Sequence, residues 1–362
     1  MTHKHGGNIY KYQKAADFSA NINFCGMPES VRQAALRGVE ESLHYPEPES
    51  SSLRKILADR EGVSEDMIFC GNGAAEVLFL LMQALRPRHA VLVQPCFFEY
   101  EQALTAVDCA ITHVYLQEEE QFQVTQHLLE AIPPQTDLIV LGNPNNPTGQ
   151  IIEKDVLEAI QSYCQKQEIW LVLDESFSDF LTDEDAKKTK SGMELNGSKI
   201  FVVKSFTKMY AMPGLRFGYG ICRDKAVLEA MICRTQPWNV SRPAQEAAKA
   251  AAQEREFAKS SSRMTRENRE WMTQQLQAAG YQVVPSCTNY LFFSGPAGLV
   301  DYALERGYLI RDCSNFRGLE RQTDQKQYYR ICIRSQKENE GLLAVLQSFR
   351  MEKEGVTWQK QS

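Results

Sequence analysis

Short runs of β-branched and aliphatic residues recur along the first 225 residues, separated by stretches in which apolar positions repeat every three or four residues. Runs of the first kind indicate buried strands, and stretches of the second kind indicate helices with one buried face. The strands are predicted at residues 90–93, 137–141, 169–173 and 200–203, and two of the helices at residues 76–85 and 154–165. Strands that alternate with helices in this way predict an α/β fold with a mostly parallel sheet.

The pattern changes after about residue 225. A long polar helical stretch is predicted at residues 242–279, and strand-like runs follow at residues 290–293 and 329–333. A chain of 362 residues exceeds the size at which a single hydrophobic core stops growing, so a large domain with a smaller companion is expected. The predicted parts are an N-terminal arm that contributes to the small domain and the ligand site (residues 1–40), a large ligand-binding domain (41–225) and a small α+β domain (226–362).

The composition excludes several classes of partner. The formal net charge is −6, whereas nucleic acids and anionic membranes are bound by a basic surface. The ten cysteines are scattered singly, without the paired spacing or the His-rich tract of a zinc site. The first 17 residues have no apolar signal-peptide core, and no uninterrupted apolar run reaches about 18 residues. We expect a cytoplasmic protein with reduced thiols and no metal, whose partner is a small molecule.

Parallel sheets place their ligands at the carboxyl ends of their strands, so the residues that follow each predicted strand are the first candidates for chemistry. The segment GNGAAE (residues 71–76) opens a helix after an apolar run, and its glycines let backbone amides face an anion. A plain loop-to-helix turn is the structural alternative. Phe97, in the segment QPCFFEY, follows the next strand and either stacks on a flat ligand or is an ordinary core residue.

Polar groups also follow the remaining three strands. In GNPNNPTG (residues 142–149), the prolines leave Asn146 with few purely structural roles. In LVLDES, an apolar strand ends in Asp174, and a buried acid is costly unless a cation or a protonated nitrogen pairs with it. The last strand leads into SFTKMYAMPGLRFGYG, which carries Lys208 and Arg216. A lone lysine is more often a surface residue, but this constellation indicates an anionic and electrophilic ligand.

One ligand meets all of these requirements: pyridoxal 5'-phosphate, which has an aldehyde, a phosphate, a flat ring and a basic ring nitrogen. Lys208 would form the Schiff base, and Asp174 would keep the pyridine nitrogen protonated so that the ring withdraws electrons. The groups expected around the phosphate are the guanidinium of Arg216, the hydroxyls of Ser205 and Thr207, and the backbone amides of Gly73, Ala74 and Ala75.

Five segments resemble those of the fold-type-I aminotransferases, a family of pyridoxal-phosphate enzymes. They are GNGAAE, GNPNNPTG, LDESF, SFTKMYAMPGLRFGY and YYRICIR, and they occur in the family's order over essentially the whole chain. The resemblance implies a large domain with a mostly parallel sheet flanked by helices, and a smaller α+β domain. It also implies Lys208 as the Schiff-base lysine, Asp174 as the partner of the pyridine nitrogen and Asn146 as a donor to the ring hydroxyl. Phe97 would stack on the ring, and Arg330 would bind the substrate carboxylate.

The resemblance further implies a homodimer with shared active sites. The segment HYPEPESSSLR is similar to the one from which, in this family, a tyrosine reaches the cofactor phosphate of the neighbouring subunit. Tyr45 is the candidate for that role. An ordinary turn tyrosine before Pro46 is the alternative.

Within the family, the chain resembles histidinol-phosphate aminotransferases and, in more segments, the threonine-phosphate decarboxylases of cobalamin biosynthesis. The segments HGGNIY, DFSANIN, LIRDCSNF and YYRICIRSQKEN carry the second resemblance. Phe177 does so too, at a position where aminotransferases usually have a tyrosine that bonds the ring oxygen. A conservative aromatic exchange is the alternative. In the decarboxylase the opening loop and the first asparagine of Asn-Ile-Asn lie over the substrate, which makes His5 and Asn21 candidates. Arg311 is expected to hold the substrate phosphate with them, and a solvated arginine beside Asp312 is the alternative. Arg334 is a further candidate, because alternation along a strand would place it on the same face as Arg330.

The resemblance therefore implies decarboxylation of an O-phosphorylated amino acid, above all L-threonine O-3-phosphate to (R)-1-aminopropan-2-yl phosphate. One alternative is a histidinol-phosphate-type aminotransferase that uses 2-oxoglutarate. A more remote one is a non-catalytic regulator that binds pyridoxal phosphate, but such a regulator normally has a basic DNA-binding module, which no segment here supplies. Phe24 in place of a usual proline and the lengthened loop FRGLERQTDQKQ are departures from the pattern. A different small phosphorylated amino acid would fit the same residues.

Overall fold

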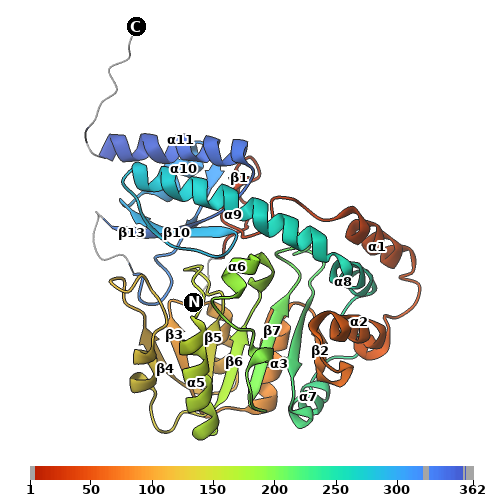
Figure 1. The fold of residues 1–362 in the computed structure, drawn as a ribbon. Helices are drawn as coiled ribbons and strands as arrows, with labels where there is room; N and C mark the ends of the chain where they lie inside the picture. The colour runs from red at the N-terminus through yellow and green to blue at the C-terminus, as the bar shows by residue number, and fades with distance from the viewer. Residues whose placement is uncertain (1–4, 321–325, 354, 356–362) are drawn as a thin grey trace.

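The computed structural model describes residues 5–320, 326–353 and 355, and Figure 1 shows two regions, a large sheet with its helices and a smaller sheet region above it. The large sheet has the strand order β2-β8-β7-β6-β5-β3-β4. Its strands are β2 (Ile68–Gly71), β3 (His89–Gln94), β4 (Ala110–Tyr115), β5 (Leu138–Gly142), β6 (Trp170–Asp174), β7 (Ile200–Ser205) and β8 (Gly218–Cys222). Only β8 runs antiparallel to its neighbours in this sheet. The predicted mostly parallel α/β sheet is confirmed.

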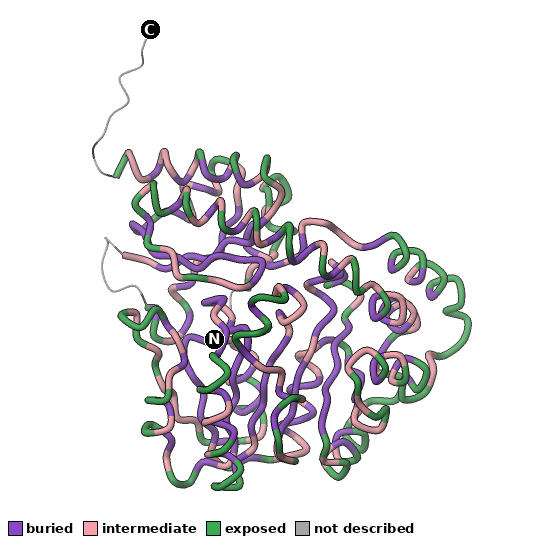
Figure 2. Tube along the Cα trace, viewed as in Figure 1, coloured by how far each residue is buried: buried purple, intermediate pink, exposed green. Residues whose placement is uncertain are grey.

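Helices cover both faces of the large sheet. Packed against one face are α3 (Ala74–Leu85), α4 (Phe98–Thr105) and α7 (Lys225–Ile232). Packed against the other are α2 (Ser51–Glu61), α5 (Lys154–Lys166) and α8 (Arg242–Gln253), with α1 (Glu29–Glu40) against α8 and the short α6 (Asp183–Ala186) after β6. Figure 2 shows the consequence: the central strands are buried, and exposed residues gather on the outer helices.

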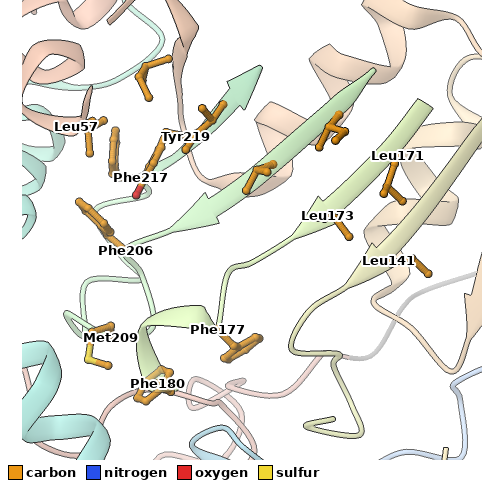
Figure 3. Packing of buried hydrophobic residues seen from close by; sticks show 14 of the residues in the cluster. Leu57, Leu141, Leu171, Leu173, Phe177, Phe180, Phe206, Met209, Phe217 and Tyr219 are labelled. Atoms are coloured by element: carbon orange, nitrogen blue, oxygen red, sulfur yellow. The ribbon is translucent and has the colours of Figure 1, made fainter. Parts of the chain in front are cut away.

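Alternate residues of the central strands enter two different cores. In β6, Leu171 and Leu173 belong to the core that includes α5, whereas Val172 belongs to the core that includes α3. Figure 3 shows the first of these cores, where the two leucines lie on the same side of the sheet as Phe206 and Phe217. Strands that are buried on both faces need apolar residues at every position, which is why they are recognisable as continuous apolar runs in the sequence.

The smaller region is built on an antiparallel sheet of order β12-β13-β10-β9. Its strands are β9 (Gln282–Val284), β10 (Tyr290–Gly295), β12 (Arg311–Asp312) and β13 (Gln327–Cys332). The helices α9 (Arg255–Ala278), α10 (Leu299–Glu305) and α11 (Gln336–Lys353) pack against it. Near the N-terminus, β1 (Ala16–Asp17) pairs with β11 (Tyr308–Leu309), which ties the start of the chain to this region.

The stretch that was predicted as helical over residues 242–279 is two helices, α8 and α9, which meet at Glu254. The buried alanines of α8 pack in the core of the large region, although α8 lies after residue 225. The division of the chain at residues 40 and 225 stays a prediction. Residues 1–4 of the predicted arm, 321–325 of the lengthened loop, and 354 and 356–362 of the predicted small domain lie outside the described residues.

Candidate active site

A cavity of about 230 Å³ lies between the carboxyl ends of the central strands and the strands β12 and β13 of the smaller sheet. The predicted site residues that line it are His5, Asn21, Ala74, Ala75, Phe97, Asn146, Asp174, Ser205, Thr207, Lys208, Arg216, Arg311 and Arg330. Gly73 stands beside it as the N-cap residue of α3. Tyr45 is not part of this wall. The structure thus brings together segments that are up to 325 residues apart, such as His5 and Arg330; the role of each residue stays a prediction.

Lys208 follows the end of β7 and reaches the cavity from the large sheet. Burial, together with the positive charges of Arg330 and Arg216, lowers the pKa of Lys208 to about 8, from 10.5 for a free lysine. At pH 7 about a tenth of this amine is therefore uncharged, far more than for a free lysine, and the uncharged form is the one that attacks an aldehyde. This chemistry agrees with the predicted Schiff-base role.

Asp174 ends β6 as a buried carboxylate that is held on both oxygens. The hydroxyl of Tyr100 donates to Oδ2 at 2.7 Å, and the backbone N–H of Ser176 donates to Oδ1 at 2.9 Å. Burial and the neighbouring Asp174 raise the pKa of Tyr100 well above its usual value, so the tyrosine stays a donor. Sequence reasoning missed Tyr100. The available signal was its place three residues after Phe97, and the two rings meet edge-on with centroids 5.7 Å apart.

A group of donors that suits a phosphate surrounds the N-terminus of α3. A Cβ on Gly73 would lie 2.6 Å from Nη2 of Arg216, so glycine is needed for the guanidinium to approach the helix start. The hydroxyls of Ser205 and Thr207 lie 2.7 Å apart on the adjoining wall of the cavity. Backbone amides at a helix N-terminus, hydroxyls and an arginine together form a strong site for an anion with several oxygens.

Arg330 connects the smaller sheet to the loop after β5. It donates through Nη1 to Oδ1 of Asn146, which leaves the Asn146 amide nitrogen as the donor for a ligand. Its Nη2 donates to the backbone oxygen of Ser19 at 2.9 Å. Its buried Nε has no acceptor among the described residues, and the buried Oδ1 of Asn21 likewise has no donor among them. Both residues line the cavity.

Arg311 lies on β12, directly opposite Arg330 on β13. It is buried, and its Nη2 donates to Oδ1 of Asn315 at 2.9 Å, while its guanidinium lies over the ring of Phe316. Burial and the nearby charge of Arg330 lower the pKa of Arg311. On the opposite wall His5 lies 3.3 Å, Nε2 to Oε1, from Glu99 of α4, which sequence reasoning did not single out.

The prediction for Arg334 is wrong. Alternation along a strand would place it on the same face as Arg330, but β13 ends at Cys332 and alternation does not extend past the strand end. Arg334 instead pairs with Glu338 of α11 at 2.7 Å and donates to the backbone oxygen of Asp17. It is not among the residues that line the cavity.

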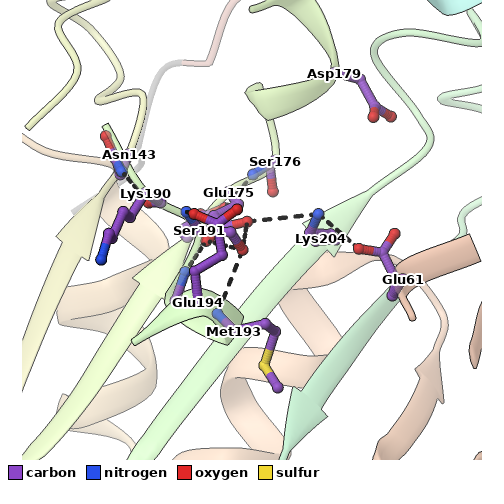
Figure 4. Close-up of polar contacts among 12 residues, drawn as sticks. Glu61, Asn143, Glu175, Ser176, Asp179, Lys190, Ser191, Met193, Glu194 and Lys204 are labelled. Atoms are coloured by element: carbon purple, nitrogen blue, oxygen red, sulfur yellow. Dashed lines mark hydrogen bonds and ion pairs between the residues drawn. The ribbon is translucent and has the colours of Figure 1, made fainter. Parts of the chain in front are cut away.

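A network of charged side chains joins the ends of β6 and β7 (Figure 4). Nζ of Lys204 lies 2.9 Å from Glu61 and 3.5 Å from Glu175, and Glu175 also accepts the Gly192 N–H at 2.6 Å. Burial alone would lower the pKa of Lys204, but the two carboxylates raise it above its usual value, so its charge persists. Because Glu175 follows Asp174 directly and Lys204 lies four residues before Lys208, this network stabilises the strand ends that carry the reactive groups.

Comparison with known proteins decides the family. The sequence pattern of the family described as aminotransferase class I and II matches residues 13–346. The chain belongs to this aminotransferase family. Its enzymes depend on pyridoxal 5'-phosphate, which is the cofactor expected from the sequence and is confirmed at the level of the family. Among the described residues, no cluster of His, Cys, Asp or Glu side chains is arranged to hold a metal ion, and none of the helices there is long and apolar enough to cross a membrane.

Similar proteins within the aminotransferase family are of two kinds. The threonine-phosphate decarboxylase of Salmonella typhimurium is 36% identical over 356 residues, which cover 95% of this chain and 96% of the relative. The solved L-threonine-O-3-phosphate decarboxylase from Porphyromonas gingivalis has a TM-score of 0.78 at 27% identity and covers 92% of this chain and 98% of its own. The solved histidinol-phosphate aminotransferase from Clostridium acetobutylicum has a TM-score of 0.84 at 26% identity, with 92% and 99% covered. The predicted fold-type-I architecture is confirmed by these likenesses.

The cavity of this aminotransferase-family chain fits pyridoxal phosphate. Lys208 has a lowered pKa, and the carboxylate of Asp174, fixed by hydrogen bonds to both of its oxygens, lies on the same wall. The Gly73 position leaves room for Arg216 at the phosphate cradle, where a Cβ would intrude. Phe97 lines the cavity on the α4 side, where a ring can stack. Phe177 also lines it, packed edge-on against Tyr290 at 5.0 Å, and brings no hydroxyl to that position.

Proposed function

We propose that this protein decarboxylates an O-phosphorylated amino acid, above all L-threonine O-3-phosphate, to give (R)-1-aminopropan-2-yl phosphate. The observation that carries the proposal is the pair of buried arginines, Arg311 and Arg330, in the same cavity as Lys208. Two arginines suit a substrate with two anionic groups. Phosphothreonine carries a carboxylate and a phosphate, whereas histidinol phosphate carries a phosphate alone.

In the proposed reaction, Arg330 binds the carboxylate, and Arg311 binds the phosphate with His5 and Asn21. The phosphate is remote from the bond that breaks, so its binding energy is available to fix the orientation of the carboxylate at Cα. When bound, the cofactor supplies a ring that accepts the electron pair left at Cα. Asp174 would keep a proton on the ring nitrogen of the bound cofactor.

The products depend on which bond at Cα is oriented for cleavage. The bond between Cα and the carboxylate carbon breaks, carbon dioxide leaves, and Cα takes up one proton. Lys208 is placed to deliver that proton, because its pKa of about 8 lets the amine both hold and release a proton near neutral pH. The buried walls around it limit the access of water to Cα.

A histidinol-phosphate-type aminotransferase is the second candidate, supported by the likeness to the solved Clostridium acetobutylicum enzyme. The arginine pair would then serve glutamate, whose two carboxylates also fit two arginines. In that reaction Lys208 would remove the proton from Cα instead of supplying one. The two candidates therefore share every residue of the cavity and differ in which bond at Cα breaks.

We also propose a homodimer in which Tyr45 completes the phosphate site of the partner. In this chain Tyr45 is 73% exposed and stacks on Trp238 with ring centroids 4.2 Å apart. Trp238 is itself 46% exposed. Exposed aromatic pairs are typical of surfaces that another protein covers.

The proposal is tested by product analysis on the purified holoenzyme. O-phospho-L-threonine, O-phospho-L-serine and histidinol phosphate are each supplied with 2-oxoglutarate, and carbon dioxide and glutamate are measured separately. We expect stoichiometric carbon dioxide from O-phospho-L-threonine and no glutamate. Glutamate from histidinol phosphate, with no carbon dioxide from either phosphoamino acid, would replace the decarboxylase by the aminotransferase. The variant Lys208→Ala serves as the inactive control in both assays.

A further inference from the structure

Ser19 joins two parts of the cavity wall that come from opposite ends of the chain. Its backbone oxygen accepts a hydrogen bond from Nη2 of Arg330 at 2.9 Å. Its side-chain Oγ accepts the Gly7 N–H at 2.7 Å and donates to Oδ1 of Asp17 at 2.6 Å. Ser19 is 1% exposed and lines the cavity. One residue thus holds both the N-terminal segment and the arginine proposed to bind the substrate carboxylate.

The N-terminal segment reaches Ser19 only because two glycines lie there. A Cβ on Gly6 would lie 2.2 Å from the Ser19 carbonyl oxygen, a distance that real Cβ atoms do not reach. Gly7 has a φ of +81°, which side-chain-bearing residues rarely adopt. The segment docked in this way carries His5 to Glu99 on α4 of the large region. Residues 5–7 therefore span the cavity from the smaller sheet to the large one.

Ser19 itself is fixed to the smaller sheet region. Asp17, which accepts the Ser19 N–H at 2.8 Å, belongs to β1 and pairs with Leu309 of β11. The next backbone oxygen, that of Phe18, accepts the N–H of Cys332 at the end of β13. Arg330 lies two residues earlier on the same strand. A displacement of Ser19 would therefore reach Arg330 in two ways. One is the hydrogen bond from Arg330 to the Ser19 backbone oxygen, and the other is the bond between Phe18 and Cys332 on the strand that carries Arg330.

We propose that Ser19 is a positioning residue that couples the docking of residues 5–7 to the orientation of Arg330. The two groups proposed to hold the substrate's anions, His5 and Arg330, are then set together, so a substrate that engages both is favoured over one that engages only the arginine. This inference rests on the proposed function for the nature of those anions. It assigns Ser19, Gly6 and Gly7 a part in substrate selectivity.

The coupling is tested by a double-mutant cycle on the holoenzyme with O-phospho-L-threonine. We expect His5→Ala and Ser19→Ala each to raise KM about tenfold, the size of one lost buried hydrogen bond, with a smaller change in kcat. The double variant should raise KM by less than the product of the two single effects, because both variants disturb the same docked segment. A hundredfold rise in the double variant, or an unchanged KM in Ser19→Ala, overturns the coupling.

A second measurement follows the docked segment without turnover. The rate at which diethyl pyrocarbonate modifies His5 is measured by mass spectrometry, without substrate. We expect faster modification in Ser19→Ala and in Gly6→Ala, whose added Cβ displaces the segment, than in the parent protein or in Tyr10→Ala, a control at a side chain that is 85% exposed. Equal rates in all four proteins overturn the inference. Because this readout needs no reaction, a failed inference is distinguishable from a parent enzyme that releases no carbon dioxide.

Discussion

Arg311 and Arg330 occupy directly paired positions of two antiparallel strands, and both guanidinium groups line one buried cavity. Like charges in directly opposed positions repel, and burial adds the cost of lost hydration. Asn146 and Asn315 each accept one hydrogen bond from the pair, which offsets only part of that cost because neither brings a negative charge. The proposed substrate, with a carboxylate and a phosphate, would supply two negative charges to this pair.

Replacing Arg311 and replacing Arg330 should affect the reaction in two different ways. We expect Arg311→Gln to raise KM for O-phospho-L-threonine about 10- to 100-fold, the size of a lost charge-assisted hydrogen bond, with kcat changed less. Arg330→Gln should also lower kcat, because the carboxylate loses its orientation. Steady-state kinetics with Arg306→Gln as the surface control checks this. An Arg311 variant with the parent KM would remove Arg311 from the site.

Lys208→Ala should abolish the covalent attachment of the cofactor. We expect the parent protein to give a yellow absorbance band with pyridoxal phosphate, and borohydride followed by peptide mapping to place the label on Lys208. The alanine variant should bind the cofactor only reversibly, through the phosphate cradle around Ser205 and Thr207. A reducible attachment that survives in Lys208→Ala would show that another lysine is the partner.

Cofactor capture by the cofactor-free protein should depend on pH with a midpoint near 8. The pKa of Lys208 is lowered to about 8, so the attacking neutral amine becomes dominant as the pH rises through that value rather than through 10.5. Arg330→Gln removes a positive neighbour, which should raise the pKa and move the midpoint to higher pH. Stopped-flow absorbance between pH 6 and pH 10 measures the rate. A midpoint that falls in Arg330→Gln would contradict this electrostatic account.

Asp174→Asn should lower turnover by about 10²- to 10⁴-fold, because the neutral amide cannot hold a proton on the ring nitrogen. Tyr100→Phe removes the hydrogen bond to Oδ2 and leaves the carboxylate, so we expect a smaller loss. The ratio of the two losses separates the contribution of the Asp174 charge from that of its orientation by Tyr100. Rates measured at saturating cofactor provide the comparison, and equal rates in Asp174→Asn and the parent would remove Asp174 from the mechanism.

Tyr45→Phe should weaken cofactor binding in the partner subunit and leave the dimer intact. Trp238→Ala should do the same to a lesser degree, because the indole ring only stacks on Tyr45. Equilibrium dialysis measures cofactor affinity, and light scattering measures the oligomeric state. Mixing Tyr45→Phe with Lys208→Ala subunits should restore one intact phosphate site per mixed dimer. A fully active monomer would end the shared-site hypothesis.

The local motifs were readable because their chemistry is contained in short segments. GNPNNPTG, LVLDES and the turn that holds Lys208 each follow a strand whose apolar run marks its end, and parallel strands bring such ends to one edge. Ala74, Asn146, Asp174 and Lys208 therefore meet in the cavity as expected. The prediction for Arg334 was wrong because the alternation of side chains along a strand was assumed to continue past Cys332, where the strand ends.

What the sequence determined by itself was the set of reactive groups and the α/β framework that collects them, since both depend on residues that are near one another in the chain. Only the tertiary structure placed Arg311 opposite Arg330, because strand register is set by pairing across residues that are 19 apart. It alone joined Ser19 to Gly6, through a close backbone approach, and to Gly7, whose N–H donates to the serine Oγ. Contacts of this kind leave no period in the sequence, because they are made by the packing of segments that the chain brings together only on folding.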